Sequence, residues 1–130
     1  MTSIDLAKHP ITPTSFGRWQ ALNTPLGVTA FGISAIVCDP DEPLGIEHDE
    51  TETGQEEAYI VVAGRARFTV GGDQIDAAPG QVVAVSDPSV TRGFMALEPG
   101  TRIVCVGAAP TGTETGYGEW ITDAATGDDV

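Results

Sequence analysis

The sequence has very little lysine, only two histidines and no long apolar run. One lysine and five arginines stand against 19 acidic residues, which gives a net charge of −13 over 130 residues. Nucleic acid and anionic membranes attract basic surfaces, so this charge argues against both partners. No apolar run approaches the length of a bilayer span. We therefore expect a protein that binds neither nucleic acid nor membrane.

Two further scarcities bear on location and on cross-linking. The first ten residues contain Asp5, Lys8 and His9 where a signal peptide would need an apolar stretch, so a cytoplasmic location is expected. The two cysteines, Cys38 and Cys105, each lie in an apolar run, where a free cysteine behaves as a small buried hydrophobe. We expect both to be free thiols.

The composition that remains is that of a folded domain. Hydrophobic residues make up 41% and charged residues 19%, which suits a chain that buries one core. We expect a single domain over residues 1–130, with its core at 26–109 and with 1–25 and 110–130 packed on that core or frayed. Nine of the acids fall between Asp39 and Glu57. This cluster is either a solvated loop face or a rim that attracts cations.

Turn residues break the chain at short intervals, which is typical of antiparallel sandwiches and barrels. The clearest hairpin spans residues 65–76, where apolar and polar residues alternate up to Gly71 and Gly72, and adjacent glycines suit a two-residue turn. The other predicted strands are residues 28–37, 44–48, 57–63, 81–85, 90–97 and 102–107. Short helical segments are expected only at 15–22 and 120–125, with Trp19 and Trp120 packing over the two ends of the barrel.

Two segments in the middle of the chain resemble the conserved motifs of the cupin superfamily. Glu57 is followed by AYIVVA and then Gly64, which matches the glutamate-to-glycine spacing of the first cupin motif, and the run from Pro79 and Gly80 to Val85 is similar to the second. The resemblance covers about fifty residues, from Gly45 to Phe94. It implies an all-β fold, a cupin-type antiparallel β-barrel of the jelly-roll or double-stranded β-helix kind.

The sequence departs from the cupin pattern at the metal-binding histidines. The first motif normally carries two histidines before its glutamate, and here only His48 lies nearby. When the step to Glu57 is shortened to the family's spacing, Thr51 and Thr53, or Glu50 and Glu52, fall at the two histidine positions. The third histidine of the pattern falls near Thr91 or Arg92. We therefore expect a degenerate metal site.

A metal-bound alternative stays open on these residues. His48, Glu50 and Glu57 could hold a divalent cation, because imidazole and carboxylate groups are metal ligands. Arg92, expected near the same end of the barrel, would repel that cation. We therefore expect the protein to have no cofactor. If it does bind a cofactor, we expect a divalent metal.

The resemblance also implies that Glu57 points into the barrel, where a buried carboxylate needs a partner. Arg92 is the candidate. Their meeting would form either an ion pair that fills the place of the metal, or a polar pocket lined by Tyr59, Phe68 and Phe94 in which Arg92 binds a ligand carboxylate.

Three classes of function follow. The leading prediction is a small cupin without the three-histidine site that binds a small ligand, such as a carboxylate, or has a non-catalytic role. The alternative is an enzyme: a metal-dependent oxygenase or isomerase using His48, Glu50 and Glu57, or a metal-free acid-base catalyst using Glu57 and His48. The third is a partner-binding protein. A homodimer through the outer sheet face is expected in every case.

Overall fold

The computed structural model describes residues 2–15, 17–42 and 47–110. Over these residues the chain forms strands joined by short turns, with one short helix. In chain order the elements are β1 (Thr12–Thr14), β2 (Gly17–Ala21), α1 (Asn23–Leu26), β3 (Gly32–Cys38), β4 (Glu56–Ala63), β5 (Ala66–Val70), β6 (Asp73–Ala77), β7 (Val82–Val85), β8 (Arg92–Ala96) and β9 (Thr101–Ala108). None of the described residues forms a helix with the length and hydropathy of a bilayer span.

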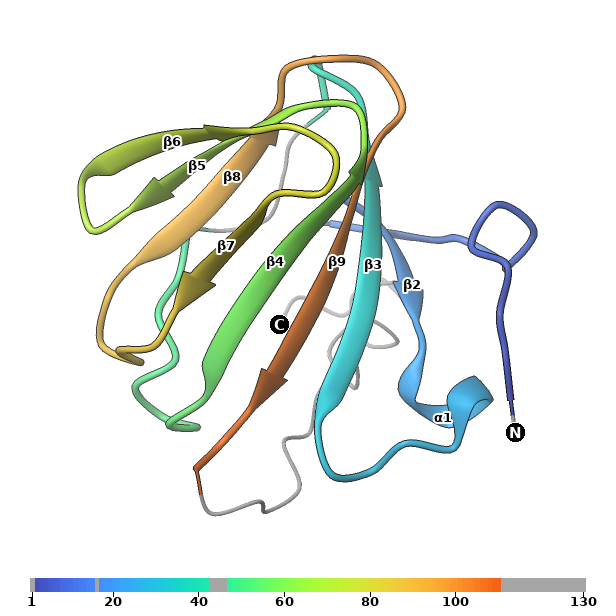
Figure 1. The fold of residues 1–130 in the computed structure, drawn as a ribbon, viewed down its shortest axis with the longest axis horizontal. Helices are drawn as coiled ribbons and strands as arrows, with labels where there is room; N and C mark the ends of the chain where they lie inside the picture. Colours follow the sequence, from blue (N-terminus) through green and yellow to red (C-terminus); the bar gives the residue numbers. More distant parts are fainter. Residues whose placement is uncertain (1, 16, 43–46, 111–130) are drawn as a thin grey trace.

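Two antiparallel sheets make up the fold (Figure 1). The larger sheet has the strand order β1-β2-β3-β9-β4-β7, and the smaller sheet has the order β6-β5-β8. The chain passes from the larger sheet at β4 to the smaller at β5, returns at β7, crosses again to β8 and returns at β9. This exchange of strands between facing sheets is a jelly-roll barrel, and the predicted fold class is confirmed.

The core lies between the sheets, and the alternation of side chains is most regular along β9. In β9 every second side chain is buried, including Ile103 and Cys105, and these lie beside Ile36 of β3 and Val61 of β4 in the same cluster. Phe68 of β5 packs against the cluster from the smaller sheet. Cys38 and Cys105 are both buried thiols, as predicted.

The hairpin predicted from Gly71 and Gly72 is present. Strand β5 pairs with β6 in a register that ends at Val70 opposite Asp73. The two glycines between them have φ angles of 57° and 94°, the left-handed region that other residues adopt at a cost. The turn therefore needs glycine at both positions.

The segment predicted as helix at residues 15–22 is instead strand β2, so this prediction is wrong. Trp19 faces the core and pairs with Ile36, while Arg18 pairs with Val37 on the other face. A glycine at position 17 disfavours helix, and pairing along β3 decides the conformation. Trp19 thus packs inside the barrel.

Two other predicted elements differ in extent, and a third cannot be compared. Strand β3 begins at Gly32, four residues later than predicted. Of the strand predicted at residues 44–48, positions 44–46 lie outside the described residues, and His48 forms only an isolated bridge to Arg92. The segment at 120–125, with Trp120, also lies outside the described residues.

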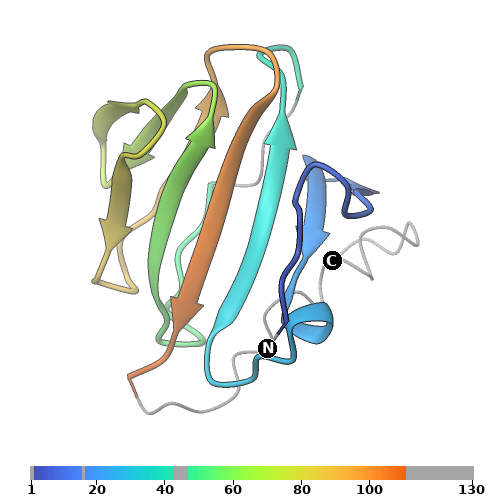
Figure 2. The same cartoon turned by 45° about the vertical axis from the view of Figure 1, so that its right-hand side comes forward.

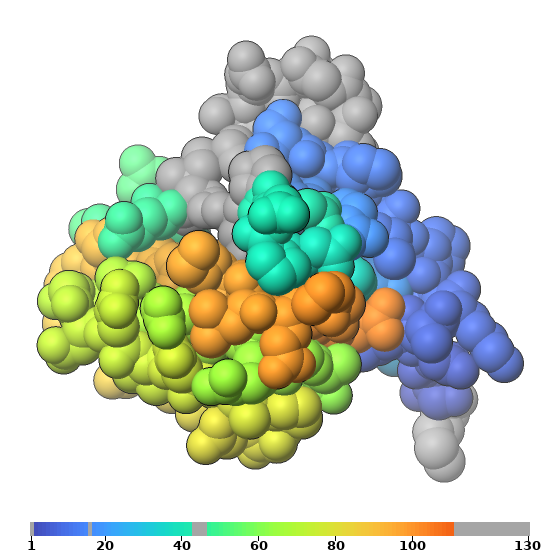
Figure 3. Space-filling view, turned by 90° about the horizontal axis from the view of Figure 1, so that it is seen from above, coloured from blue at the N-terminus to red at the C-terminus, as the bar shows by residue number. Residues whose placement is uncertain are grey.

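Part of the acidic cluster is paired. Arg18 Nε donates to Glu42 Oε2 at 2.8 Å, and its Nη2 lies 3.4 Å from Asp39 Oδ2. Asp39 Oδ1 also accepts a hydrogen bond from the Gly100 amide at 2.7 Å, which joins the loop after β3 to the loop before β9 (Figure 3). Asp39 and Glu42 therefore connect the loop after β3 to β2 and to the loop before β9, in addition to facing solvent.

Candidate functional site

The site begins on β4, which carries Glu57 and Tyr59 on its inner face. Because side chains alternate along a strand, residues 57, 59 and 61 share one face, and all three are buried. The Tyr59 hydroxyl donates to Glu57 Oε1 at 2.9 Å. Burial, together with the negative charge of Glu57, raises the pKa of Tyr59 well above its ordinary value. Tyr59 is therefore a neutral donor that holds the carboxylate.

Arg92 reaches the same carboxylate from the opposite sheet. It is the first residue of β8, and its side chain is 1% exposed. Nη1 donates to Glu57 Oε1 at 2.7 Å, Nε donates to the Val90 carbonyl at 2.9 Å, and Nη2 donates to the Asp87 carbonyl at 3.2 Å. Each guanidinium nitrogen thus has an acceptor. The predicted meeting of Glu57 and Arg92 inside the barrel is confirmed.

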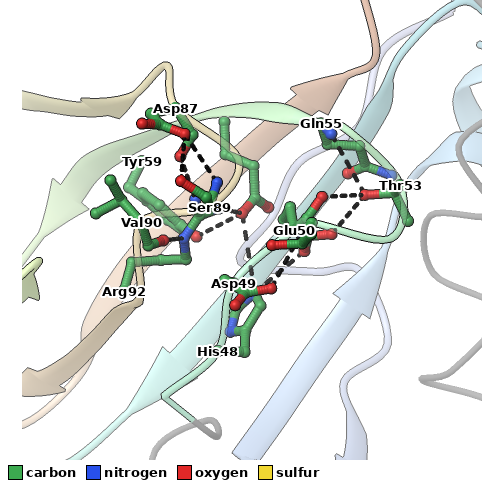
Figure 4. A network of polar contacts seen from close by, with 12 residues as sticks. His48, Asp49, Glu50, Thr53, Gln55, Tyr59, Asp87, Ser89, Val90 and Arg92 are labelled. Atoms are coloured by element: carbon green, nitrogen blue, oxygen red, sulfur yellow. Dashed lines mark hydrogen bonds and ion pairs between the residues drawn. The ribbon is translucent and has the colours of Figure 1, made fainter.

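His48 and Glu50 complete the group from the segment before β4 (Figure 4). Paired backbone hydrogen bonds, 2.9 Å and 2.7 Å, hold His48 against Arg92. His48 Nε2 lies 3.2 Å from Glu50 Oε1 and 3.8 Å from Glu57 Oε1. The His48 side chain is 43% exposed, whereas that of Glu50 is 17% exposed. The group therefore runs from a half-exposed imidazole to a buried ion pair.

Glu50 is held in its ionised form by its neighbours. Burial acts to raise its pKa, but the hydrogen bonds with His48 and Thr53, aided by the charge of Arg92, outweigh burial and leave the pKa of Glu50 below its ordinary value. The Thr53 hydroxyl donates to Glu50 Oε2 at 2.7 Å. The cupin spacing placed Thr53 at the position of a metal-binding histidine. No sequence pattern predicted its contact with Glu50.

The aromatic residues predicted to line a pocket pack against one another. The ring centroids of Tyr59, Phe68 and Phe94 lie 5.5 Å to 5.7 Å apart in each pair, with tilted planes. Such contacts are typical of aromatic cores. The three rings fill the space between the sheets beside the ion pair.

A shallow depression of about 200 Å³ lies elsewhere, on β5 and β8. Its lining residues are Glu47, Arg67, Thr69, Gly93, Phe94 and Met95. Phe94 is thus the one predicted site residue that also borders this depression. His48, Glu50, Glu57 and Arg92 do not line it.

The donor set can be tested against a divalent cation. One ligand atom each from His48, Glu50 and Glu57 lies within 4.8 Å of the others, which is close enough for a shared ion. However, Glu57 Oε1, the atom nearest His48, already accepts hydrogen bonds from Arg92 and Tyr59. A cation bound to Glu57 Oε1 would lie close to the positively charged guanidinium of Arg92, which is hydrogen-bonded to the same oxygen. The residues fit a cation poorly while Arg92 is bound to Glu57.

Neither of the two pairs considered for the histidine positions, Thr51 with Thr53 or Glu50 with Glu52, enters the group as a whole. Glu50 points into the group, whereas Thr51 and Glu52 are exposed. At the position of the third histidine, Arg92 and not Thr91 faces Glu57. No sequence signal pointed to the carbonyls of Asp87 and Val90, which fix the guanidinium.

The fold can be compared with the folds of known proteins. No family model and no curated protein matches the sequence, but its structure is similar to many solved ones. The chain has the fold of a small cupin domain.

Three of the similar structures are cupins of comparable size. KdgF from a Halomonas species superposes with a TM-score of 0.68 at 15% identity, covering 82% of this chain and 92% of that one. A sugar phosphate isomerase of the cupin superfamily from Silicibacter pomeroyi gives 0.66 at 17% identity, covering 82% and 74%. A cupin 2 conserved barrel protein from Salinispora arenicola gives 0.61 at 20% identity, covering 86% and 90%. At these identities the likeness establishes the fold alone.

Removing Arg92 tests how strongly the buried pair is coupled. In Arg92→Met the Glu57 carboxylate keeps only weaker neighbours in a buried position, so we expect a loss of roughly 3–5 kcal/mol in the free energy of unfolding. Urea denaturation measures it. Arg67→Met is the matched control, because Arg67 pairs with Asp76 at the surface, and should lose far less. Equal losses in the two variants would contradict the assignment.

The lowered pKa of Glu50 predicts a pH dependence. A carboxyl whose pKa is lower in the folded state stabilises that state above the ordinary pKa of 4.5, and the contribution disappears as the pH falls through the lower folded value. The stability difference between the wild type and Glu50→Gln should therefore shrink as the pH is lowered below about 4.5. Glu52→Gln, at an exposed position, should show no such trend. A difference that grows in acid would refute the prediction.

Proposed function

We propose that this chain is a small-ligand-binding cupin in which the Arg92–Glu57 ion pair takes the place of the three-histidine metal centre. The observation that carries the proposal is the position of the Arg92 guanidinium, buried and hydrogen-bonded to Glu57 from the facing sheet. A fixed positive charge there performs the electrostatic task of a metal, because it neutralises a carboxylate inside the barrel.

The ligand would bind at the half-exposed side of the group, next to His48 and Glu50. Glu50 is an ionised acceptor and His48 offers an imidazole at the surface. A ligand rich in hydrogen-bond donors, such as a polyol or an amine, matches this set. A ligand carboxylate, which the sequence suggested, is less well matched, because the Arg92 nitrogens already have acceptors.

The second candidate is a metal-dependent oxygenase or isomerase that uses His48, Glu50 and Glu57. The observation that favours it is the convergence of these three donors. Two of the similar structures are described as sugar phosphate isomerases, one of them as a putative one. A phosphorylated substrate suits this chain poorly, since its net charge of −13 repels phosphate.

Metal content and ligand-induced thermal shifts distinguish the two candidates. The protein is purified without a metal-affinity step, and the wild type is compared with His48→Ala and Glu52→Gln. We expect no stoichiometric transition metal in any of them. We expect polyols or amines to raise the Tm of the wild type and of Glu52→Gln, but not of His48→Ala.

Two results would contradict the proposal. Stoichiometric metal that disappears in His48→Ala would establish the metal-dependent candidate. If polyols, amines and carboxylic acids all leave the wild-type Tm unchanged, the ion pair is a structural element without a ligand site beside it.

A further inference from the structure

The shallow depression of about 200 Å³ opens on the outer side of the smaller sheet. Two of its lining residues, Arg67 and Thr69, alternate along β5 with the buried Phe68 and therefore point away from the core. Figure 2 shows β4, β9 and β3 of the larger sheet side by side in front (green, orange-brown and cyan), with the smaller sheet behind their left part. The depression thus faces away from the larger sheet and is separate from the candidate site.

Gly93 creates the space in the depression. In the register of β5 and β8, Thr69 lies opposite Gly93, and the neighbouring position pairs Arg67 with Met95. Glu47 lies on the other side of Gly93, because a Cβ added at Gly93 would be 3.4 Å from the Cα, Cβ and Cγ atoms of Glu47. The backbone itself does not need glycine here, since the φ angle of Gly93 is not positive. The missing side chain at position 93 therefore leaves room between Thr69 and Glu47.

The depression has a negative group beyond β8 and a positive group on β5. Glu47 is exposed, and the ion pairs among the described residues do not include it. Arg67 donates to Asp76 through Nε at 2.8 Å and through Nη2 at 3.1 Å. This two-bond pair orients the guanidinium and leaves the N–H groups of Nη1 for another acceptor. A ligand in the depression would therefore meet a carboxylate without an ion-pair partner and an oriented donor.

The surface between the two charged groups is apolar. Met95 is 47% exposed although it is a large hydrophobic residue, and it follows Phe94 and Gly93 along β8. The flexible thioether of an exposed methionine is an adaptable contact for an aliphatic group. The volume of the depression corresponds to roughly seven molecules of liquid water, which is room for a small molecule only.

We propose that the depression binds a small zwitterion, an α-amino acid with an aliphatic side chain. Its ammonium group donates to Glu47, its carboxylate accepts from Nη1 of Arg67, and its side chain covers Met95. A zwitterion carries no net charge, so the net charge of −13 does not repel it as it repels a carboxylic acid. An amine without a carboxylate would bring its positive charge close to the guanidinium of Arg67 with no group to bind that guanidinium.

The first test is a titration of the full chain, followed by amide NMR signals, with three matched probes. L-Leucine carries both charges, isoamylamine keeps only its ammonium group, and isocaproic acid keeps only its carboxylate. We expect leucine to shift the amide signals of Thr69, Gly93 and Met95 with a Kd of about 1 mM, because a small open site makes few contacts. At these signals the other two probes should bind about fivefold more weakly or less, since each lacks one charge-assisted hydrogen bond.

The second test repeats the leucine titration on variants of the lining residues. Gly93→Ala adds a methyl group that has ordinary contacts of 3.4 Å with Glu47 and occupies the centre of the depression. Glu47→Gln and Arg67→Gln each remove one charge. We expect each of the three to weaken leucine binding by about fivefold or more, with an unchanged circular dichroism spectrum. Glu52→Gln and Arg65→Gln are the matched controls at exposed positions outside the depression, and they should bind leucine as the wild type does.

Several outcomes would overturn the proposal. They are a wild type whose signals leucine leaves unchanged, an amine or a carboxylic acid that binds the depression as tightly as leucine, and a Gly93→Ala variant that binds leucine as the wild type does. Shifts confined to His48 and Glu50 would mean that leucine binds at the candidate site, which also overturns a site in the depression. None of these results bears on the proposed function, whose test depends on His48→Ala.

Discussion

The contact between Arg92 and Glu57 links the two sheets at the polar end of the barrel. Glu57 lies on β4 of the larger sheet, and Arg92 begins β8 of the smaller one. A charge buried in a low-dielectric interior is tolerated only when it is paired and hydrogen-bonded. Tyr59 and the carbonyls of Asp87 and Val90 supply the remaining bonds. The facing strands must therefore keep one spacing for the pair to form.

The rest of the candidate site follows from that pair. The backbone of Arg92 bridges to His48, which directs the imidazole toward Glu50 and Glu57. Thr53 then fixes the other oxygen of Glu50. A guanidinium supplies a permanent positive charge that no chelator removes, but it offers no open coordination position at which a substrate could bind. Under the proposed function, the groups that the site offers to a ligand are the imidazole of His48 and the carboxylate of Glu50.

Local patterns predicted much of this molecule. Gly71 and Gly72 predicted the hairpin, and alternation predicted the inward face of β4. The resemblance to cupins predicted that Glu57 and Arg92 meet inside the barrel. Strand β2 was not predicted because its conformation depends on pairing with β3, and the residues of β2 alone do not reveal that pairing. The carbonyls around Arg92 could not be predicted, since the direction of a backbone carbonyl depends on the loop conformation.

A crystal structure grown with excess manganese tests the central claim most directly, through anomalous scattering at the group formed by His48, Glu50 and Glu57. The account predicts that Arg92 stays hydrogen-bonded to Glu57 and that no anomalous peak lies among these three residues. A strong peak there, with the guanidinium of Arg92 turned away from Glu57, would contradict it.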